Sequence, residues 1–315
     1  MSPLRIIFMG TAELSCASLE KLSSDSRFQV VAVVTQPDKP KGRDLKLTPS
    51  PVKVWAEKLG LPVLQPLKAR DENFIAQLRE LKPDLIVVVA YGQILSQTIL
   101  DLPPHGCVNV HTSLLPKYRG AAPIQWAIAD GNAETGVTIM KMDAGLDTGP
   151  ILSMRRTPIL PTDDSQILHD RLAQLGAEQL VETLPEYVSG KIQPRPQPAE
   201  GSTYAAKIKK EDGKIDWNQP AIDIWNRLRA FTPWPGAFTF LHTEGKSQLL
   251  KIWKAEPAEK SGRAGEILAT DKTGIVVACG QSALRILELQ REGGKRLTAE
   301  QFIAGFPLKP GIKFQ

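Results

Sequence analysis

Cysteine and histidine are both scarce in this 315-residue chain, which holds three Cys and four His residues. Cys16, Cys107 and Cys279 lie far apart without a CxxC pair, and no two histidines have the spacing of metal ligands. We therefore expect neither a disulfide scaffold nor a bound metal ion. Free thiols are typical of a reducing cytoplasm.

Long apolar runs and a charged leader segment are also absent. No apolar stretch reaches the roughly 18 residues of a membrane span, and the chain opens on a strand-like segment rather than on a signal peptide. The sequence predicts a cytoplasmic protein without a membrane partner. Because single cores seldom grow past about 250–300 residues, we expect two domains.

A dinucleotide fingerprint is missing as well. Residues 4–10 predict a buried strand ending at Gly10, followed by a helix at 12–22 with Thr11 as its N-cap and a strand at 28–34. This order predicts a parallel sheet with right-handed crossovers. The Gly10 turn lacks the GxGxxG spacing. It therefore either binds a small anionic or polar ligand or serves only the packing of the strand–helix–strand unit.

The same alternation continues to residue 189. Strands are expected at 62–65, 85–90, 106–110, 135–142 and 151–157, and helices at 52–59, 71–81, 122–130 and 163–189. Continuous apolar character marks 85–90 as a central strand. Tyr91 follows at its carboxyl end, where open α/β sheets bind ligands. Its ring either stacks on an aromatic ligand or caps the core.

Residues 36–51 form an unusually long connection that is rich in proline and in basic residues. Connections in α/β units usually take about 2–6 residues, and longer ones tend to be functional or disordered. This segment is either a mobile solvated loop or one that contacts phosphate groups. Its basic residues are Lys39, Lys41, Arg43 and Lys46.

The last third of the chain has a different pattern. Three prolines between 190 and 206 predict an extended linker. Five short strands between 237 and 290 then predict a small β-barrel of a kind that binds nucleic acids, with a β-sandwich as the alternative. From Lys207 onward, 18 Lys+Arg against 12 Asp+Glu give a charge of +6. This excess indicates either a polyanionic partner or a solvated surface.

The strongest chemical signal lies between 107 and 150. Asn109 and His111 are two residues apart on an expected strand, so both side chains leave the same face. A glycine-rich loop with Asp143 and Asp147 follows. An amide and an imidazole can stabilise an oxyanion, while a carboxylate can orient the imidazole or accept an amine proton. The alternative is a satisfied structural Asn–His pair.

A nucleophile elbow is not found around Ser113 or any cysteine. Direct attack by a substrate amine on a bound acyl donor is therefore favoured over a covalent enzyme intermediate.

A resemblance to the folate-dependent formyltransferase family rests on three stretches: Asn109-Val-His111-Thr-Ser113-Leu-Leu-Pro116, Arg119-Gly120 and Asp143-Ala-Gly-Leu-Asp147-Thr-Gly149. The resemblance implies that Asn109, His111 and Asp147 are catalytic and that 10-formyltetrahydrofolate is the one-carbon donor, without a metal. The implied folate-binding residues are Ser113, Leu114, Leu115, Pro116, Ala90, Tyr91, Gly92, Met142 and Asp143.

Further matches cover the whole chain, for example at 8–11, 35–38, 204–205 and 215–217. They are similar to the family members that act on methionine attached to initiator tRNA. The resemblance implies transfer of the formyl group to the free amino group of that methionine. The implied tRNA-binding residues are Lys39, Lys41, Arg43, Lys46, Lys207, Lys209 and Lys210.

The predicted fold is α/β, with a Rossmann-like, mostly parallel sheet and flanking helices in a catalytic domain at 1–189. A linker at 190–206 leads to a small OB-like β-barrel that binds tRNA at 207–315, and we expect a monomer.

Two rival functions are kept beside this one. The first is a family member with the same formyl chemistry that acts on a sugar-nucleotide amine or hydrolyses formyl-folate. The basic loop at 36–51 disfavours this function. The second is a non-catalytic nucleic-acid-binding module, which the Asn, His and Asp set disfavours.

Overall fold

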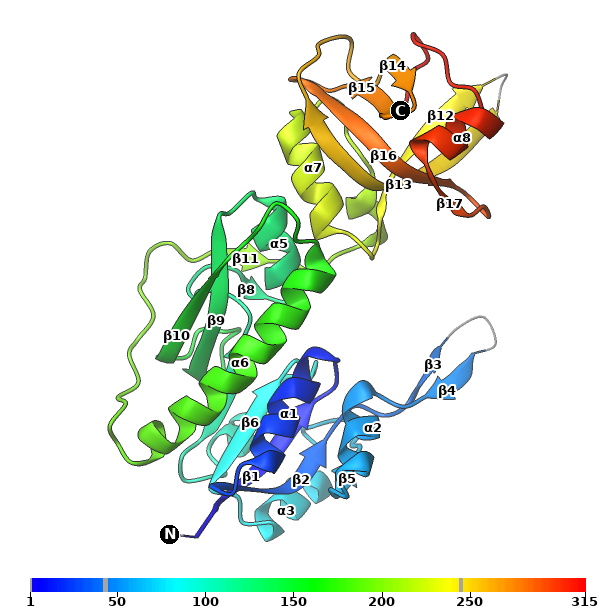
Figure 1. Cartoon of the computed structure of the whole chain (residues 1–315). Helices are drawn as coiled ribbons and strands as arrows, with labels where there is room; N and C mark the ends of the chain where they lie inside the picture. The colour runs from blue at the N-terminus through cyan, green and yellow to red at the C-terminus, as the bar shows by residue number, and fades with distance from the viewer. Residues whose placement is uncertain (1, 42–44, 244–245) are drawn as a thin grey trace. The chain divides into compact units, whose positions relative to one another are not determined.

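The structure, a computed structural model, describes residues 2–41, 45–243 and 246–315 (Figure 1). The chain folds into two compact units. The first comprises Met1–Pro123, Glu134–Pro158 and His169–Ala205, and the second Ile124–Ala133, Ile159–Leu168 and Ala206–Gln315. Two short segments from the first two-thirds of the sequence thus belong to the second unit. The predicted domain limits at 189 and 207 stay a prediction.

The first unit is built on one seven-stranded sheet with the order β10-β9-β7-β6-β1-β2-β5. Its strands are β1 (Leu4–Gly10), β2 (Phe28–Val34), β5 (Val63–Leu64), β6 (Leu85–Val89), β7 (Cys107–His111), β9 (Glu134–Lys141) and β10 (Ile151–Pro158). Neighbouring strands are parallel except for the β7–β9 and β9–β10 pairs. The strand order reverses between β1 and β6, so the carboxyl ends of these strands form a switch point at which ligands bind in such sheets.

Two sets of helices cover the two faces of this sheet. The helices of the first unit are α1 (Leu14–Ser24), α2 (Pro51–Lys58), α3 (Glu72–Glu80), α4 (Gln97–Leu100) and most of α6 (Ser165–Val188). Figure 1 shows α6 lying across β9. A Cβ built on Gly176 of α6 would come within 2.9 Å of Val110 Cγ1, so this helix packs against the face that carries Val110.

The opposite face of the sheet carries the candidate site. Cys107 packs into a core cluster with Phe74 and Leu78 of α3 and Ile99 of α4. Because side chains alternate along a strand, Asn109 and His111 leave the sheet on the same face as Cys107. Among the described residues, no helix combines the length and the apolar character needed to cross a bilayer.

Two local predictions in this unit are wrong. The first helix begins at Leu14, and its N-cap is Glu13, which makes no side-chain capping bond. Thr11 does not cap that helix, since its Oγ1 donates instead to the carbonyl of Tyr91 at 2.8 Å. The hydroxyl therefore joins the turns after β1 and β6, a long-range contact that local capping rules do not anticipate.

Residues 36–51, predicted as one long loop, include secondary structure, while their contact with phosphate groups stays a prediction. They contain an antiparallel hairpin of β3 (Lys39–Lys41) and β4 (Lys46–Thr48). Polar contacts anchor its base, because Lys53 pairs with Asp38 at 2.8 Å and the hydroxyls of Thr35 and Ser50 are 2.7 Å apart.

The second unit contains α7 (Ala221–Ala230) and an antiparallel sheet with the order β12-β13-β16-β15-β14, to which β17 adds on β16. The strands are β12 (Ala237–Thr243), β13 (Lys246–Ala258), β14 (Ile267–Asp271), β15 (Gly274–Ala278), β16 (Ala283–Arg291) and β17 (Arg296–Thr298), followed by α8 (Ala299–Gly305). Helices α4 and α8 and strand β17 were not predicted from the sequence.

The carboxyl-terminal residues 311–315 close this sheet on itself. On one side, Phe240 and Gln315 exchange backbone hydrogen bonds of 3.0 and 2.9 Å. On the other, Phe314 N donates to Gly265 O and Ile267 N to Ile312 O, both at 2.8 Å. The first and last strands of the sheet are thus joined, which leaves a closed barrel rather than the alternative sandwich.

Phe314 is the structural centre of this closure. It is 1% exposed and stacks on Trp217 with 5.8 Å between ring centroids. We predict that Phe314→Ala lowers the free energy of unfolding by about 3–5 kcal/mol, the usual loss for a buried Phe. Urea denaturation of the full chain, followed by tryptophan fluorescence and circular dichroism, measures the loss.

The matched control is Lys309→Ala, an exposed position just before the terminal segment, which should change stability by less than about 0.5 kcal/mol. A loss below about 1 kcal/mol for Phe314→Ala would show that the terminal segment does not hold the barrel closed.

Candidate active site

Strand β7 places the first two candidate groups. Asn109 and His111 are 9% and 6% exposed, opposite Met140 and Thr138 of β9. The amide of Asn109 makes no hydrogen bond to any residue that the structure describes. Its nitrogen and oxygen are not among the fully buried side-chain atoms that lack a partner, so the amide still reaches solvent, where a ligand can bind it. Asn109 and His111 are thus not hydrogen-bonded to each other, and their catalytic role stays a prediction.

The His111 ring is fixed by a bond to the loop that follows its own strand. Its Nε2 lies 2.9 Å from the carbonyl oxygen of Tyr118. A carbonyl only accepts hydrogen bonds, so Nε2 carries the proton and donates. Nδ1 lies 3.7 Å from Asp147 Oδ2, which is too long for a hydrogen bond. Nδ1 is thus the ring nitrogen that remains available for a ligand.

Asp147 is held in place by backbone groups. Its Oδ2 accepts a hydrogen bond from Gly120 N at 2.8 Å, and its side chain is 16% exposed. Its φ is +52°, in the left-handed region, which is unfavourable by roughly 1–2 kcal/mol for an L-residue. Ala90 and Tyr118 also have positive φ values, of 45° and 58°. Backbone strain of this kind clusters at functional sites, where the surrounding structure enforces it.

The loop between β9 and β10 is closed by its own polar groups. Asp143 Oδ1 accepts hydrogen bonds from Gly145 N at 3.0 Å and from Thr148 Oγ1 at 2.7 Å. At Gly149 a Cβ would lie 1.9 Å from the carbonyl oxygen of Lys141. Only glycine fits at this position, and it allows the loop to turn tightly enough to bring Asp147 to His111.

A segment predicted as linker also reaches this site. Strand β11 (Tyr204–Ala205) pairs with β8 (Arg119–Gly120) in the first unit. Gln197 donates from Nε2 to the carbonyls of Asp147 and Gly149, both at 2.8 Å. Gln197 was not predicted, because a proline-rich segment gives no local sign of which side chain turns back onto the fold.

The residues predicted to bind folate form two groups that meet. Thr138 Oγ1 donates to Ser113 O at 2.7 Å and accepts from Leu115 N at 3.1 Å, which pins the segment after β7 to β9. Met142 packs both against the cluster that contains Leu115 and against the one that contains Tyr91. Apolar side chains can pack against a flat heteroaromatic ring, and nearby backbone N–H and C=O groups can hydrogen-bond its polar edge. The remaining members, Leu114, Pro116, Ala90, Gly92 and Asp143, lie on the same loops.

The Tyr91 ring belongs to the core rather than to the ligand surface. It is 1% exposed, burial raises the pKa of its hydroxyl to about 12, and no described residue bonds that hydroxyl. Of the two interpretations, capping of the core is the one that the structure supports. Contact with a ligand would have to come from the Tyr91 backbone, next to the exposed Ala90.

Thiol chemistry is disfavoured in both units. Burial raises the pKa of Cys107, on β7, to about 12, and that of Cys279 to about 12. Burial together with nearby Glu13 and Glu20 raises the pKa of Cys16 to about 11. The thiolate is the nucleophilic form, so these residues support the prediction of direct attack by a substrate amine.

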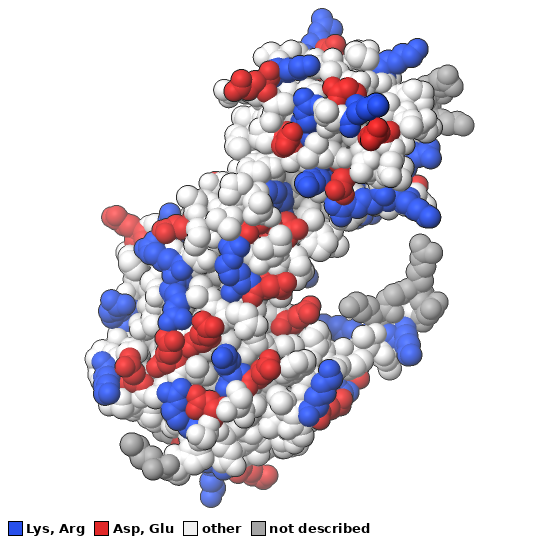
Figure 2. Space-filling view, in the orientation of Figure 1, with Lys and Arg blue, Asp and Glu red and all other residues white. Residues whose placement is uncertain are grey.

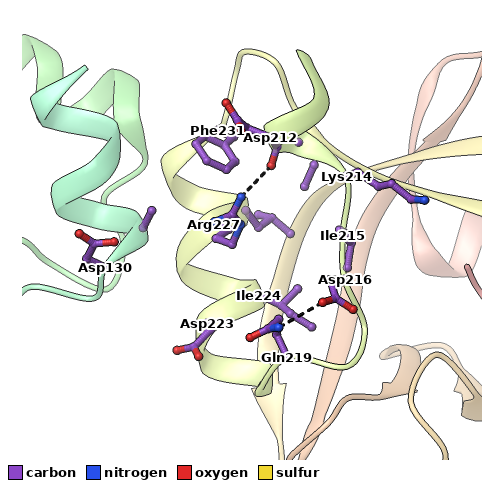
Figure 3. A pocket seen from close by; sticks show the side chains of 14 residues that line it. Asp130, Asp212, Lys214, Ile215, Asp216, Gln219, Asp223, Ile224, Arg227 and Phe231 are labelled. Carbon is purple, nitrogen blue, oxygen red and sulfur yellow. Dashed lines mark hydrogen bonds between the residues drawn. The ribbon is translucent and has the colours of Figure 1, made fainter. Parts of the chain in front are cut away.

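A cavity of about 650 Å³ lies elsewhere, within the second unit, between α7 and the segment around Lys214 (Figure 3). Two of its charged groups are bonded to neighbours, since Arg227 donates to Asp212 O at 3.2 Å and Asp216 Oδ2 accepts from Gln219 at 3.1 Å. No imidazole or thiol is among its lining residues. This cavity does not supply the groups that acyl transfer needs.

The basic residues predicted to bind tRNA lie in both units. Lys39 and Lys46 are exposed on the hairpin, and Lys207, Lys209 and Lys210 are exposed at the start of the second unit's main segment. For Lys41 only the backbone is described, and Arg43 lies outside the described residues. Their role stays a prediction.

Comparison with known proteins identifies the family of the chain. The family model described as formyl transferase matches residues 4–184, and the model of the formyl transferase C-terminal domain matches residues 207–307. The chain belongs to the formyl transferase family. It is therefore an enzyme of one-carbon transfer, and the resemblance stated from its motifs is confirmed.

Curated relatives match over nearly their whole length. Proteins named methionyl-tRNA formyltransferase are 52% identical in Geobacter sulfurreducens, over 99% of this chain and 97% of theirs, and 54% identical in Geobacter metallireducens, over 99% of both. The protein of that name from Myxococcus xanthus is 52% identical over 99% of this chain and 98% of its own.

Solved structures show the same fold at much lower identity. A sugar 3N-formyl transferase, solved in the presence of dTDP and 5-N-formyl-THF, is 19% identical with a TM-score of 0.66, covering 91% of this chain and 97% of its own. HypX from Aquifex aeolicus, solved with tetrahydrofolic acid, is 19% identical with a TM-score of 0.61, covering 97% of this chain and 48% of its own. At such identities the likeness describes the fold alone.

We predict that Gly149→Ala lowers kcat by about 10²-fold, because the added methyl displaces the loop that carries Asp147 by about an ångström. Steady-state formyl transfer by the purified variant measures this loss. Gly305→Ala is the control, since a Cβ there has nothing within 4 Å. Unchanged kcat in Gly149→Ala would mean that the position of this loop does not matter to turnover.

Proposed function

We propose that this chain transfers the formyl group of 10-formyltetrahydrofolate to the free amino group of methionine on initiator tRNA, giving N-formylmethionyl-tRNA. The observation that carries the proposal is the 52–54% identity to relatives named methionyl-tRNA formyltransferase over 97–99% of each chain. Both units of the chain are included in this likeness, so the whole protein and not only the catalytic fold is shared.

The catalytic roles follow from the atoms that remain available. The Asn109 amide has no partner within the described residues, and in this proposal it donates to the formyl oxygen as negative charge develops there. His111 Nδ1, free of a close hydrogen bond, is the second donor when the ring is protonated. A carboxylate 3.7 Å from Nδ1 balances the charge of the protonated ring and keeps it oriented.

Asp147 has a second role in this proposal. An attacking amine must lose a proton as its nitrogen bonds to the formyl carbon, and Asp147 accepts that proton directly or through water. Its Oδ2 is already bonded to Gly120 N, which leaves the other lone pairs of the carboxylate for the substrate. The bound folate supplies the activated formyl carbon, and the residues around Met142 would hold it.

The tRNA side of the proposal is supported by charge. Exposed basic residues lie on the hairpin of the first unit and throughout the second unit, where the segment from Lys207 onward carries +6. Figure 2 shows both signs interspersed over the visible surface, with Lys and Arg gathered near the position that Figure 1 labels β17. Arg291, Lys295 and Arg296 are exposed there. Such groups bind phosphates without reading sequence.

In this proposal residues 1–189 form the catalytic domain, 190–206 a linker and 207–315 the tRNA-binding barrel of a cytoplasmic monomer. The rival substrate is a sugar-nucleotide amine. Its solved representatives are 17–21% identical to this chain, which carries no argument about substrate. Turnover of the same enzyme on methionylated initiator tRNA and on a nucleotide-linked amino sugar separates the two, and the proposal fails if the sugar is the better substrate.

We predict that Asn109→Ala lowers kcat by about 10²–10³-fold, the usual effect of losing one oxyanion donor. His111→Ala and Asp147→Ala should each lower kcat by about 10²–10⁴-fold, because general acid–base assistance is lost. Formyl transfer from 10-formyltetrahydrofolate to methionylated initiator tRNA measures each rate.

The control for these three variants is Asp101→Ala, at an exposed position whose carboxylate bonds only Gln97 among the described residues. It should have normal turnover. Near-normal activity in any of the three site variants would remove that residue from the proposed mechanism.

We predict that the triple variant Lys207→Ala, Lys209→Ala, Lys210→Ala raises the KM for tRNA about tenfold while the KM for folate stays unchanged. Loss of three phosphate contacts should also lower the slope of log KM against log salt by as much as about 2.7. Titrations in KCl measure the slope. An unchanged slope would place these lysines away from the tRNA backbone.

A further inference from the structure

Residues 195–205 run across both loops that carry the active-site groups. Arg195 and Ile151, at the start of β10, exchange backbone hydrogen bonds of 2.7 and 2.9 Å. Further along, Thr203 accepts from Arg119 N at 2.9 Å with its carbonyl and from Tyr118 N at 2.8 Å with its hydroxyl. The first contact borders the Asp147 loop, and the second borders the loop whose Tyr118 carbonyl holds His111.

Gln197 lies between these anchors, and its amide is fully used. Nε2 donates to the carbonyls of Asp147 and Gly149 at 2.8 Å each. Oε1 accepts from Arg119 Nε at 3.1 Å and from Arg119 Nη2 at 2.7 Å. An amide has two donors and two acceptor lone pairs, and all four are taken by the two loops.

The chemistry of these partners fixes both the residue type and the orientation of its amide. Two carbonyls require an N–H donor, and a guanidinium requires an acceptor, so only one amide orientation satisfies the set. A glutamate here would direct a carboxylate at two carbonyl oxygens. A methionine, similar in length, would satisfy none of the partners.

The backbone that Gln197 holds is the strained one. Asp147 has a φ of +52°, and its carbonyl is one of the two that the amide binds. The Asp147 carboxylate in turn meets Gly120 N, next to the Arg119 that Gln197 also binds. Together with the Gly120 bond, this side chain holds the Asp147 loop against the Arg119–Gly120 strand, and with it the 3.7 Å between Oδ2 and His111 Nδ1.

We propose that Gln197 is a positioning residue for the reaction, acting through Asp147. This inference rests on the proposed function, since it takes Asp147 as a group that turnover requires. Without the amide the left-handed turn at Asp147 relaxes, and the carboxylate moves relative to the imidazole. Gln197 contributes to kcat without touching either substrate.

The first test compares Gln197→Met and Gln197→Glu with Gln193→Met in the full chain. Gln193 lies in the same segment, is exposed and bonds only Gly190 O within the described chain, so it is a matched control. We expect kcat to fall by about 10- to 100-fold in both Gln197 variants, while the KM values and the control stay near the wild-type values. Gln197→Glu keeps an acceptor for Arg119, so normal turnover in it would overturn the inference.

The second test separates positioning from simple structural support. In a double-mutant cycle with Asp147→Asn, measured under single-turnover conditions, Gln197→Met should have little further effect once the carboxylate is gone. Equal fold losses in both backgrounds would show that Gln197 does not act through Asp147. A Gln197 variant with normal kcat would have the same consequence.

A spectroscopic readout gives an independent answer. In protein labelled with ¹⁵N-histidine, Gln197→Met should shift the ring nitrogens of His111 in the same direction as Asp147→Asn, and Gln193→Met should not. An unmoved His111 signal in Gln197→Met contradicts the inference. Failure of the proposed function is distinguishable, because the wild-type enzyme itself would then prefer the nucleotide-linked amino sugar to methionylated initiator tRNA.

Discussion

The carboxylate of Asp147 is held beyond hydrogen-bond distance of the His111 ring, and the remainder of the site depends on this separation. Gly120 N bonds Oδ2 at 2.8 Å, and the same oxygen stays 3.7 Å from His111 Nδ1. The ring cannot turn towards it freely, because Nε2 is fixed on the Tyr118 carbonyl. Each group of the pair is therefore anchored by a backbone atom of one short stretch, residues 118–120.

The sheet explains how distant parts of the sequence meet there. Strands β6 and β7 are parallel neighbours, so the segments that follow them emerge at one edge, next to the point where the strand order reverses. Strand β9 runs antiparallel to β7, and its bond through Thr138 ties down Ser113 and Leu115. The connections that follow these strands provide the functional side chains, and the buried strands fix the ends of those connections.

Much of the fold could be predicted wherever the residues of a strand or helix determine its position by themselves. The apolar runs of β2 and β6 gave their positions closely, and the two-residue spacing of Asn109 and His111 placed both on one face. Thr11 was assigned wrongly because its partner, Tyr91, is 80 residues away. Gln197 and the closing segment at 311–315 were missed for the same reason, since each is defined by contacts distant in sequence.

Two side-chain groups of the site remain available to a ligand. Asn109 and His111 are both less than a tenth exposed, yet the amide has no partner among the described residues and Nδ1 has no close one. Burial strengthens whatever hydrogen bonds a ligand makes to them, because less water competes. A direct His111–Asp147 hydrogen bond would occupy Nδ1 as a donor before the substrate arrived. Holding the carboxylate back, by Gly120 on its side chain and Gln197 on its backbone, leaves that donor for the oxygen that gains charge.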